Sequence, residues 1–558
     1  MVSERLKVYP AKAAVAPTST TISYQSLAFD VREATISSLH ASLFSGVTTC
    51  RDIVSSFIAR VERFDPDINA IITLNPDALS IADSLDAALS SGNATGSLFC
   101  IPILLKDNYD ATPMPSTGGC IALNSSTPAH DAPTVAAFRD AGAVILGKSN
   151  LHELALEGLS VSSLGGQTLN PYDLGRTPGG SSGGTGAAVA ASFAVFGTGT
   201  DTVNSLRSPA SANSLFSFRP TRGLISRAGV IPISYTQDTV GAIGRCLYDI
   251  ATALTVMSSV GYDPRDNVTS AAPPSTVGTD YTSFLTSFQN LTGTRIGVLE
   301  GFIDRTDTNE TTPVTSAMSA VIGLLQSQGA TVVNITDPIY NATAISSAMD
   351  VQSFEYREGL TSYLSSPDLG GTHPPSMPEL YTPNRTRPEF LVIPSQYAYL
   401  ESSLRSSTGD PGYFNKQSLI ANLTRTLHST FLSDDLDAVI YPEQKNLVVP
   451  VGSPSQSGRN GILAALTGSP VVTIPIGFSP ATDSAPVGIP IGMELLGLPF
   501  AEGTLLKLAK SIDDRLHARK VPVTNGLNET VEVTTTYTRV PKVKSLHNIP
   551  TQYPLGVY

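Results

Sequence analysis

Blocks of apolar residues recur along the chain at spacings that predict helices and strands in alternation. Apolar side chains at helical spacing predict two surface helices within residues 35–64. From residue 101 onward, short apolar runs of strand length alternate with longer amphipathic runs. Strands are predicted at 101–105, 143–149, 294–301, 330–336, 436–443, 470–477 and 488–497, and helices at 131–142, 184–196, 315–329 and 502–519. This alternation predicts an α/β fold.

The pattern contains no linker long enough to divide the chain and no internal repeat. We therefore expect one large domain over residues 31–525, with an irregular arm at 1–30 and a tail at 526–558. The chain has 558 residues, of which 41% are hydrophobic and 15% charged. That composition is typical of a soluble globular protein with a large core.

Charge and hydropathy argue against two classes of partner. The net charge is −12 and no basic residues cluster, which argues against nucleic-acid binding. No uninterrupted apolar stretch reaches the roughly 18 residues of a membrane span, and residues 1–24 lack the apolar segment of a signal peptide. The sequence thus predicts either a cytoplasmic protein or one whose leader is not included.

Asparagine sequons favour the second alternative. The Asn-x-Ser/Thr pattern occurs ten times among 22 asparagines, against about five expected by chance. The ten are Asn93, Asn124, Asn267, Asn290, Asn309, Asn334, Asn341, Asn384, Asn422 and Asn528. None lies between Asn124 and Asn267, which predicts a buried central region. We expect a secreted glycoprotein, with a cytoplasmic protein as the alternative.

The cysteines and histidines indicate no metal site, and no metal or cofactor is expected. The four cysteines include no Cys-x-x-Cys pair, and the segment from His152 to Leu156 only begins like a His-Glu-x-x-His zinc motif. Cys100 and Cys120 bracket one loop and are a candidate disulfide. Buried thiols are the alternative.

The stretch GRTPGGSSGGTGAAVAAS, residues 175–192, is the first with candidate chemistry. A flexible linker does not lead directly into an apolar helix, and a phosphate-binding loop requires a lysine that is absent here. Residues 180–184 match the Gly-x-Ser-x-Gly turn of hydrolases, but no apolar strand precedes them. Tight backbone beside a helix N-terminus is the remaining, purely structural explanation.

Two further segments change this picture. Residues 197–211, GTGTDTVNSLRSPAS, form a second loop rich in Gly, Ser and Thr, and Lys106 follows the apolar strand at 101–105. If the Lys106 ammonium is buried, loss of hydration lowers its pKa and makes it a usable general base. The alternative is a strand-end lysine that reaches solvent.

Together the three segments resemble the amidase signature family of serine hydrolases. The family patterns PxxxKDN, PGGSSGG and GTDxxxSxRxPA occur here in order, with Ser181 and Ser205 24 residues apart. The resemblance extends over roughly residues 30–520 and, with the sequons, favours a fungal-type secreted member. It implies a single large domain in which helices sandwich a large central mixed β-sheet, with a signature core at about 95–260 and a substrate-shaping segment at about 265–440.

Carried over by position, the resemblance implies a Ser-Ser-Lys triad. Ser205 is the nucleophile, Ser181 the bridging serine and Lys106 the base. The family also has a cis peptide bond before the bridging serine, here between Gly180 and Ser181.

The resemblance also assigns the residues around this triad. The backbone N–H groups that form the oxyanion hole belong to Thr202, Val203, Asn204 and Ser205, and the supporting residues are Ser182, Asp201 and Arg207. Val203 and Asn204 depart from the family, which usually has Gly-Gly before the nucleophile. Backbone donors survive this change, but glycines permit backbone angles and a close substrate approach that the two side chains resist.

The implied function is hydrolysis of a carboxylic amide, not of a peptide bond, through an acyl-enzyme at Ser205. The implied partner is a small-molecule amide substrate. One alternative is acyl transfer to an amine, and another is the amidase subunit of a tRNA-dependent amidotransferase. The last is a catalytically silent binding protein with the same fold, which the Val203-Asn204 departure favours and the presence of all three triad residues disfavours.

Overall fold

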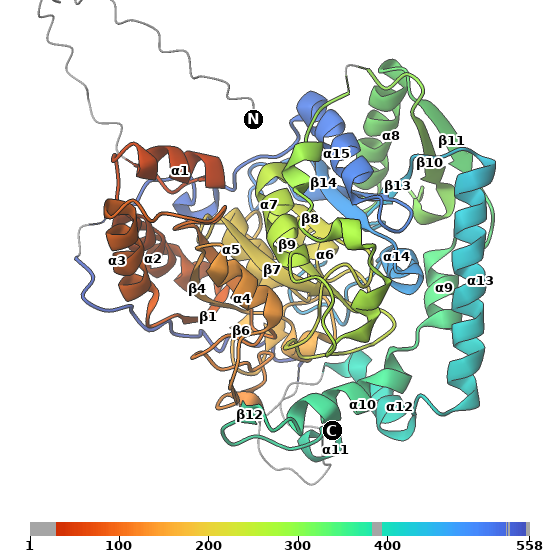
Figure 1. The fold of residues 1–558 in the computed structure, drawn as a ribbon. Coiled ribbons are helices and arrows are strands. Elements are labelled where there is room, and N and C mark those ends of the chain that lie inside the picture. The colour runs from red at the N-terminus through yellow and green to blue at the C-terminus, as the bar shows by residue number, and fades with distance from the viewer. Residues whose placement is uncertain (1–28, 289, 382–392, 532, 534–535, 554–558) are drawn as a thin grey trace, which may run out of the picture.

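The computed structural model describes residues 29–288, 290–381, 393–531, 533 and 536–553 (Figure 1). Its centre is an eleven-stranded sheet with the strand order β1-β4-β2-β7-β9-β8-β14-β15-β13-β10-β11. The strands are β1 (Ile71–Leu74), β2 (Pro102–Lys106), β4 (Val144–Ser149), β7 (Phe196–Asp201), β8 (Phe216–Arg219), β9 (Thr239–Gly244), β10 (Arg295–Leu299), β11 (Thr331–Ile335), β13 (Ala438–Pro442), β14 (Val471–Phe478) and β15 (Pro490–Leu496).

The sheet is mixed, as expected. Strand β2 pairs in parallel with β4 and β7, and β10 pairs in parallel with β11 and β13. The other neighbours are antiparallel. Because β2 and β7 run parallel, their last residues, Lys106 and Asp201, lie toward the same edge of the sheet. Parallel strands bring the loops that follow them together at such an edge.

Helices cover both faces of the sheet. On β9, Val240 and Ala242 belong to the core cluster that includes α7 (Leu247–Ser258). Ile243 instead packs with α5 (Gly183–Ala190) and α6 (Arg207–Ala212). Successive side chains of a strand point to opposite faces, so the α/β fold with helices on both sides is confirmed.

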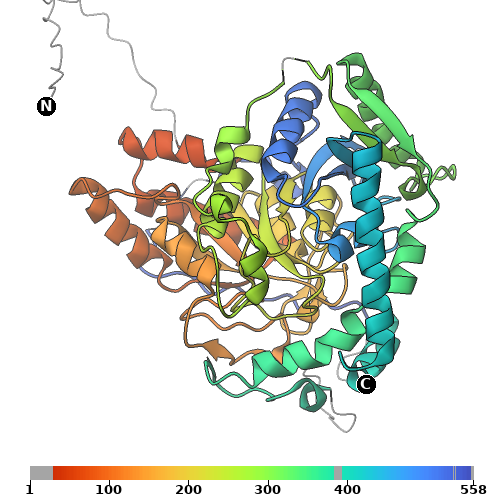
Figure 2. The same cartoon turned by 45° about the vertical axis from the view of Figure 1, so that its right-hand side comes forward.

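The remaining helices complete the two layers and the rim. Caps define their ends: Thr49 accepts a hydrogen bond from the Asp52 N–H at the start of α2, which ends at Asn69 in a left-handed conformation. The helices are α1 (Ile36–Phe44), α2 (Cys50–Ile68), α3 (Ala78–Ser90), α4 (Pro133–Asp140), α8 (Thr312–Ser327), α9 (Ala342–Met349), α10 (Gln352–Leu364), α11 (Met377–Leu380), α12 (Tyr397–Arg405), α13 (Pro411–Ser433), α14 (Ile462–Thr467) and α15 (Glu502–Leu516). The long α13 packs against α9 at the rim (Figures 1 and 2).

Two small ladders lie outside the main sheet. They pair β3 (Thr127–Pro128) with β12 (Leu369–Gly370) and β5 (Val161–Ser162) with β6 (Gly166–Gln167). No helix among the described residues is both long and apolar enough to span a bilayer.

One predicted element is wrong. The helix expected at 184–196 ends at Ala190, and residues 196–201 form β7, a central strand, where the sequence predicted a loop. Its glycines permit close packing: a Cβ on Gly197 would lie 2.6 Å from Thr185 Cγ2, and one on Gly199 2.8 Å from Ser182 Oγ. Tertiary packing therefore overrides the low strand propensity of glycine.

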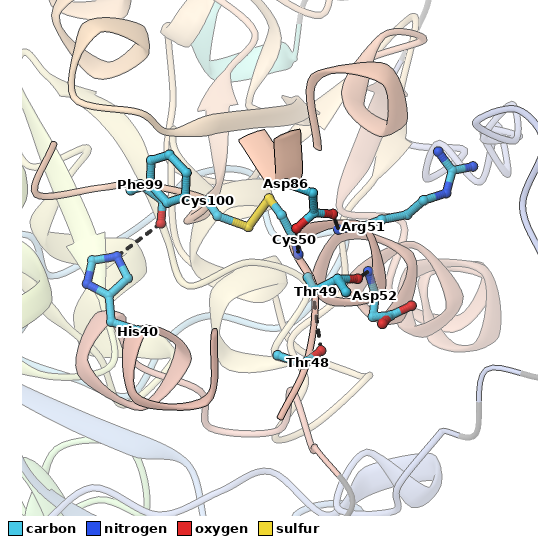
Figure 3. Close-up of a disulfide and its surroundings, with 9 residues drawn as sticks. All are labelled: His40, Thr48, Thr49, Cys50, Arg51, Asp52, Asp86, Phe99 and Cys100. Carbon is cyan, nitrogen blue, oxygen red and sulfur yellow. Dashed lines mark hydrogen bonds between the residues drawn. A yellow bond between two sulfur atoms is a disulfide. The ribbon is translucent and has the colours of Figure 1, made fainter. Parts of the chain in front are cut away.

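The candidate Cys100–Cys120 disulfide, one of the alternatives left open by the sequence, does not form. Cys100 bonds to Cys50 at the start of α2, across 50 residues, with a Cα–Cα distance of 5.7 Å (Figure 3). From Cys100, β2 leads into the interior toward Lys106, and Cys120 is buried in a separate apolar cluster with Leu123 and Leu151. Proximity in sequence was misleading because a buried strand separates the two cysteines.

The expected arm at 1–30 lies outside the described residues except for Phe29 and Asp30. The C-terminal segment follows the protein surface. The carbonyl of Tyr537 accepts a hydrogen bond from Arg51 at 2.5 Å, and Asn548 Nδ2 donates to the Gln167 carbonyl at 3.1 Å.

Candidate functional site

Lys106 ends β2 with its side chain fully buried. Its Nζ donates to Ser181 Oγ at 2.7 Å and to Thr200 Oγ1 at 2.8 Å. Burial lowers the pKa of Lys106 to about 7, against the opposing effect of the Asp201 and Asp238 carboxylates. A substantial fraction of this amine is therefore neutral near physiological pH and can accept a proton.

Ser181 lies in the loop that precedes α5. The Gly180–Ser181 peptide bond is cis, as the family resemblance led us to expect. The Ser181 carbonyl accepts a hydrogen bond from the His152 N–H at 3.0 Å, and the next N–H, that of Ser182, donates to the Ser205 carbonyl at 3.3 Å. The Ser182–Ser205 bond holds the two Gly/Ser-rich loops beside each other, and the His152 bond fixes the first of them.

Ser205 lies between β7 and α6. It is 8% exposed and lines a cavity, whereas Lys106 and Ser181 are fully buried. Its hydroxyl makes no hydrogen bond to any residue that the structure describes. The structure thus brings Lys106 and Ser181 into direct contact and joins Ser205, which lines the cavity, to them through a backbone hydrogen bond.

The N–H groups of Thr202, Val203, Asn204 and Ser205 donate to no acceptor within the described part of the chain. All four residues line the same cavity. Consecutive N–H groups without an internal partner form a concave set of donors that suits an anion. N–H groups without an internal acceptor are the kind of donor that stabilisation of an oxyanion requires.

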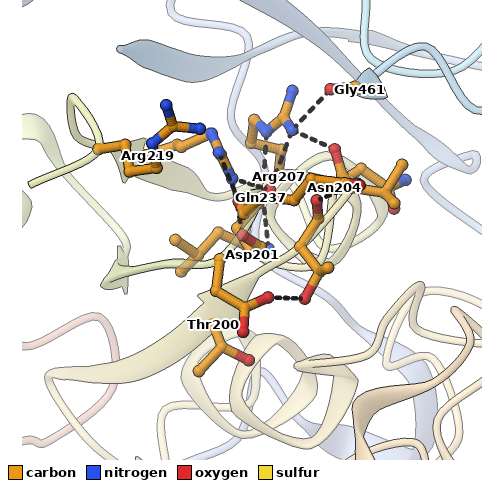
Figure 4. A network of polar contacts seen from close by, with 12 residues as sticks. Thr200, Asp201, Asn204, Arg207, Arg219, Gln237 and Gly461 are labelled. Atoms are coloured by element: carbon orange, nitrogen blue, oxygen red, sulfur yellow. Dashed lines mark hydrogen bonds and ion pairs between the residues drawn. The ribbon is translucent and has the colours of Figure 1, made fainter. Parts of the chain in front are cut away.

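A buried ion-pair network contacts the loop of residues 202–205 on its interior side (Figure 4). Asp201 accepts from Arg207 Nε at 3.0 Å and from Arg219 NH1 at 2.5 Å. These two guanidiniums hold the pKa of Asp201 well below its ordinary value despite its burial. Arg207 NH2 also donates to the carbonyls of Val203 and Gly461. Asp201 and Arg207 therefore fix the backbone on both sides of the four N–H groups.

The Asn204 side chain, which stands where the family usually has glycine, is hydrogen-bonded to the protein interior. Its Nδ2 donates to Glu443 Oε1 at 3.0 Å, and Asn204 is 1% exposed. The side chain that replaces a family glycine is thus anchored in the interior, where it does not fill the cavity. Val203 is only partly buried and contributes to the cavity wall.

The cavity beside Ser205 has a volume of about 540 Å³. Its wall includes α9 residues, the ion-paired Glu157 and Arg459, and the segment 455–459. A second cavity of about 350 Å³ adjoins it and shares the wall residues Ala155 and Thr202. The first volume lies in the range of small-molecule sites.

Sequence reasoning missed several residues of the site. Thr200 accepts hydrogen bonds from Lys106 and from Asn108, Asp238 accepts from Thr202 Oγ1 at 2.6 Å, and Gln237 donates to the Thr202 carbonyl. Thr200 lies in the quoted loop at 197–211, whereas Gln237 and Asp238 lie outside the three segments that carried the resemblance. No local spacing assigned chemistry to them. Among the described residues no cluster of His, Cys, Asp or Glu could hold a metal ion.

Comparison with known proteins agrees with this geometry. The family model described as Amidase matches residues 52–506. The chain is 30% identical over 512 residues to a chloroplastic/mitochondrial subunit of glutamyl-tRNA(Gln) amidotransferase from Sorghum bicolor, covering 86% of this chain and 89% of that protein. It is 30% identical over 510 residues to a probable amidase of Arabidopsis thaliana, with 88% and 92% covered.

A solved structure is similar along almost its whole length. The native peptide amidase from Stenotrophomonas maltophilia superposes with a TM-score of 0.75 at 31% identity, covering 88% of this chain and 98% of that chain. The family match extends over most of the sheet and both loops of the site. The chain belongs to the amidase signature family.

Proposed function

We propose that the protein hydrolyses a carboxylic amide through an acyl-enzyme on Ser205. The observation that carries the proposal is the fully buried contact of 2.7 Å between Lys106 Nζ and Ser181 Oγ, beside the Ser205 loop. A lysine buried in this way is costly unless its neutral form is used. The four unpartnered N–H groups of residues 202–205 provide the matching electrostatic support.

The reaction follows from these positions. Neutral Lys106 accepts the Ser181 hydroxyl proton while Ser181 accepts the proton of Ser205, and Ser205 Oγ bonds to the amide carbon. The carbonyl oxygen becomes an oxyanion that the N–H groups stabilise. When the C–N bond breaks, the proton returns from Lys106 through Ser181 to the departing amine. Water then attacks the acyl-enzyme by the same relay and releases the acid.

The substrate proposed is a small amide whose acyl group carries polar groups of its own. The cavity wall is rich in polar side chains, among them Ser346, Gln352 and the ion-paired Glu157 and Arg459. Polar groups in the wall of a pocket bind and orient the polar groups of a ligand. A peptide amide offers the complementary C=O and N–H groups. The scissile bond is the linear terminal amide, not an internal peptide bond.

Product analysis tests this function. Incubation with an N-acylated dipeptide amide should yield the free acid and ammonia, and Ser205→Ala should yield neither. A simple alkyl amide of the same length should react more slowly, because it leaves the polar wall unpaired. Formation of a new amide in the presence of an added amine, with little acid, would support acyl transfer instead. Binding without turnover would support the silent binding protein.

A second candidate is suggested by the Sorghum bicolor relative, whose name describes part of an amidotransferase. In that case the substrate is glutamine and the product ammonia is passed to a partner. Ammonia release from free glutamine by the isolated chain, at a rate above that for peptide amides, would favour this candidate.

We also propose that the protein is secreted and N-glycosylated. All nine sequon asparagines within the described residues are exposed, whereas eight of the twelve other asparagines are buried. Asn384 lies outside the described residues. The Cys50–Cys100 disulfide is compatible with an oxidising compartment. A fungal origin stays a prediction, since the relatives named above are plant and bacterial proteins.

A further inference from the structure

Five ionisable side chains lie together behind the Ser205 loop, and all five are completely buried. They are Asp201, Arg207, Arg219, Glu443 and Glu494. Three carboxyls face two guanidiniums, so full ionisation would leave one negative charge without a counter-ion. An uncompensated buried charge is among the most unfavourable features in a protein interior. One member of the group is therefore expected to be neutral.

The hydrogen bonds identify that member. Asp201 is bonded to both guanidiniums, and Glu494 accepts from Arg207 NH1 at 2.6 Å. Glu443 has no guanidinium partner among the described residues: its one side-chain donor there is the Asn204 amide at 3.0 Å. Glu443 Oε2 has no donor within the same part of the chain, whereas Glu494 also has Tyr441 as a side-chain hydrogen-bond neighbour. A proton on Glu443 would remove the negative charge that lacks a counter-ion.

Glu443 is held firmly in this place. It follows β13, its N–H donates to the Gly492 carbonyl of β15 at 3.1 Å, and its carbonyl accepts from the Asn460 N–H at 3.2 Å. On the other side, the Asn204 carbonyl accepts from the N–H groups of Arg207 and Ser208. The Asn204–Glu443 bond therefore ties the N–H-bearing loop to the centre of the sheet.

We propose that Glu443 is a positioning residue that works in its protonated form, tethering Asn204 so that the N–H groups of residues 202–205 face the substrate, and that its ionisation slows acylation of Ser205. The inference rests on the proposed function. It also explains how the chain accommodates Asn204 where relatives of this family usually have glycine.

The charges around Glu443 favour this protonation state. Glu494 from β15 and Asp201 from β7 oppose its ionisation, while Arg207 from α6 favours it; Tyr441 on β13 and Arg219 on β8 complete the charged or titratable surroundings. Burial and the Glu494 carboxylate raise the pKa of Glu443 to about 8. Above that pH the cluster gains a net negative charge behind the oxyanion, which opposes formation of the oxyanion.

The test uses the rate at which a fluorophosphonate labels Ser205, measured from about pH 6 to 10. Wild type should lose about tenfold in rate between about pH 7 and 10. Glu443→Gln keeps an acceptor for Asn204 but cannot ionise. It should label within about threefold of wild type at pH 7 and lack the alkaline decrease. Glu502→Gln is the matched control.

Glu502 is equally buried, 1% exposed, and bonds to Thr221 N at 2.9 Å, away from the site. Its variant should retain the wild-type profile. An alkaline decrease in Glu443→Gln equal to that of wild type would overturn the proposal. Wild type that does not label at any pH would instead contradict the proposed function, so the two failures are distinguishable.

Asn204→Ala provides a second test that does not depend on the fold of a Glu443 variant. It removes the tether but leaves every backbone N–H, and it should lower the labelling rate at pH 7 by about tenfold, with the circular dichroism spectrum unchanged. A labelling rate equal to that of wild type would show that the tether positions nothing.

Discussion

At the scale of single residues, the burial of Lys106 sets the response to acid. Its pKa of about 7 means that the protonated, inactive form dominates below that pH and the neutral base above it. The hydrolysis rate should therefore rise about tenfold per pH unit up to about pH 7, before the alkaline decrease expected from ionisation of Glu443. The measurement is kcat/KM over about pH 5 to 9. A flat profile would contradict a lysine base.

Replacing the base with a permanent cation tests the same point without changing pH. Lys106→Arg keeps a positive charge and several donors but cannot accept a proton. It should lose about 10²–10⁴-fold in kcat, as should Lys106→Gln, which controls for misfit of the larger guanidinium. Activity of either variant near that of wild type would show that the reaction needs no proton acceptor at this position.

A labelling experiment should distinguish the role of Ser181 from that of the neighbouring Ser182. Ser181→Ala interrupts the path from Ser205 to Lys106 and should slow fluorophosphonate labelling by about 10²-fold or more while leaving Ser205 as the labelled residue. Ser182→Ala removes a weaker contact, 3.4 Å to the Thr200 carbonyl, and should cost far less. Equal rates for Ser181→Ala and wild type would argue against the relay.

At the scale of elements, the sequence predicted those with clear periodicity and missed those shaped by packing. The amphipathic helices α8 and α15 and the apolar strands β10, β13 and β15 fall where the pattern placed them. Strand β7 was not predicted because glycine has a low propensity for strands. In the structure, the β7 glycines allow close contact with Thr185 and Leu206. The Asn204–Glu443 tether joins residues 239 positions apart, and no local pattern could reveal it.

The Cys50–Cys100 disulfide joins the start of α2 to the segment just before β2, whereas Lys106 lies at the other end of that strand. Closing a loop of 50 residues limits the unfolded chain, and a Cys50→Ala/Cys100→Ala variant should lose about 2–4 kcal/mol of unfolding free energy. Its kcat/KM should remain that of wild type. Denaturant unfolding and steady-state kinetics check both parts, and an unchanged unfolding midpoint would contradict the disulfide.

At the scale of the whole molecule, the exposed sequons predict a glycan coat. Enzymatic deglycosylation of protein from its native host should lower the intact mass by several glycans, each attached at an exposed Asn-x-Ser/Thr site. Peptide mapping should find the modification at positions such as Asn309 and Asn422, and at no asparagine outside the Asn-x-Ser/Thr sites. An unchanged mass would favour the cytoplasm instead.

The central claim is that the two Gly/Ser-rich loops and β2 assemble a reactive Ser205. Intact mass spectrometry after incubation with a fluorophosphonate tests it most directly, with Ser205→Ala as the control. We expect one adduct on wild type, located on Ser205 by peptide mapping, and none on the variant. A folded wild-type protein that gains no adduct, or a variant that gains the same adduct, would contradict this claim.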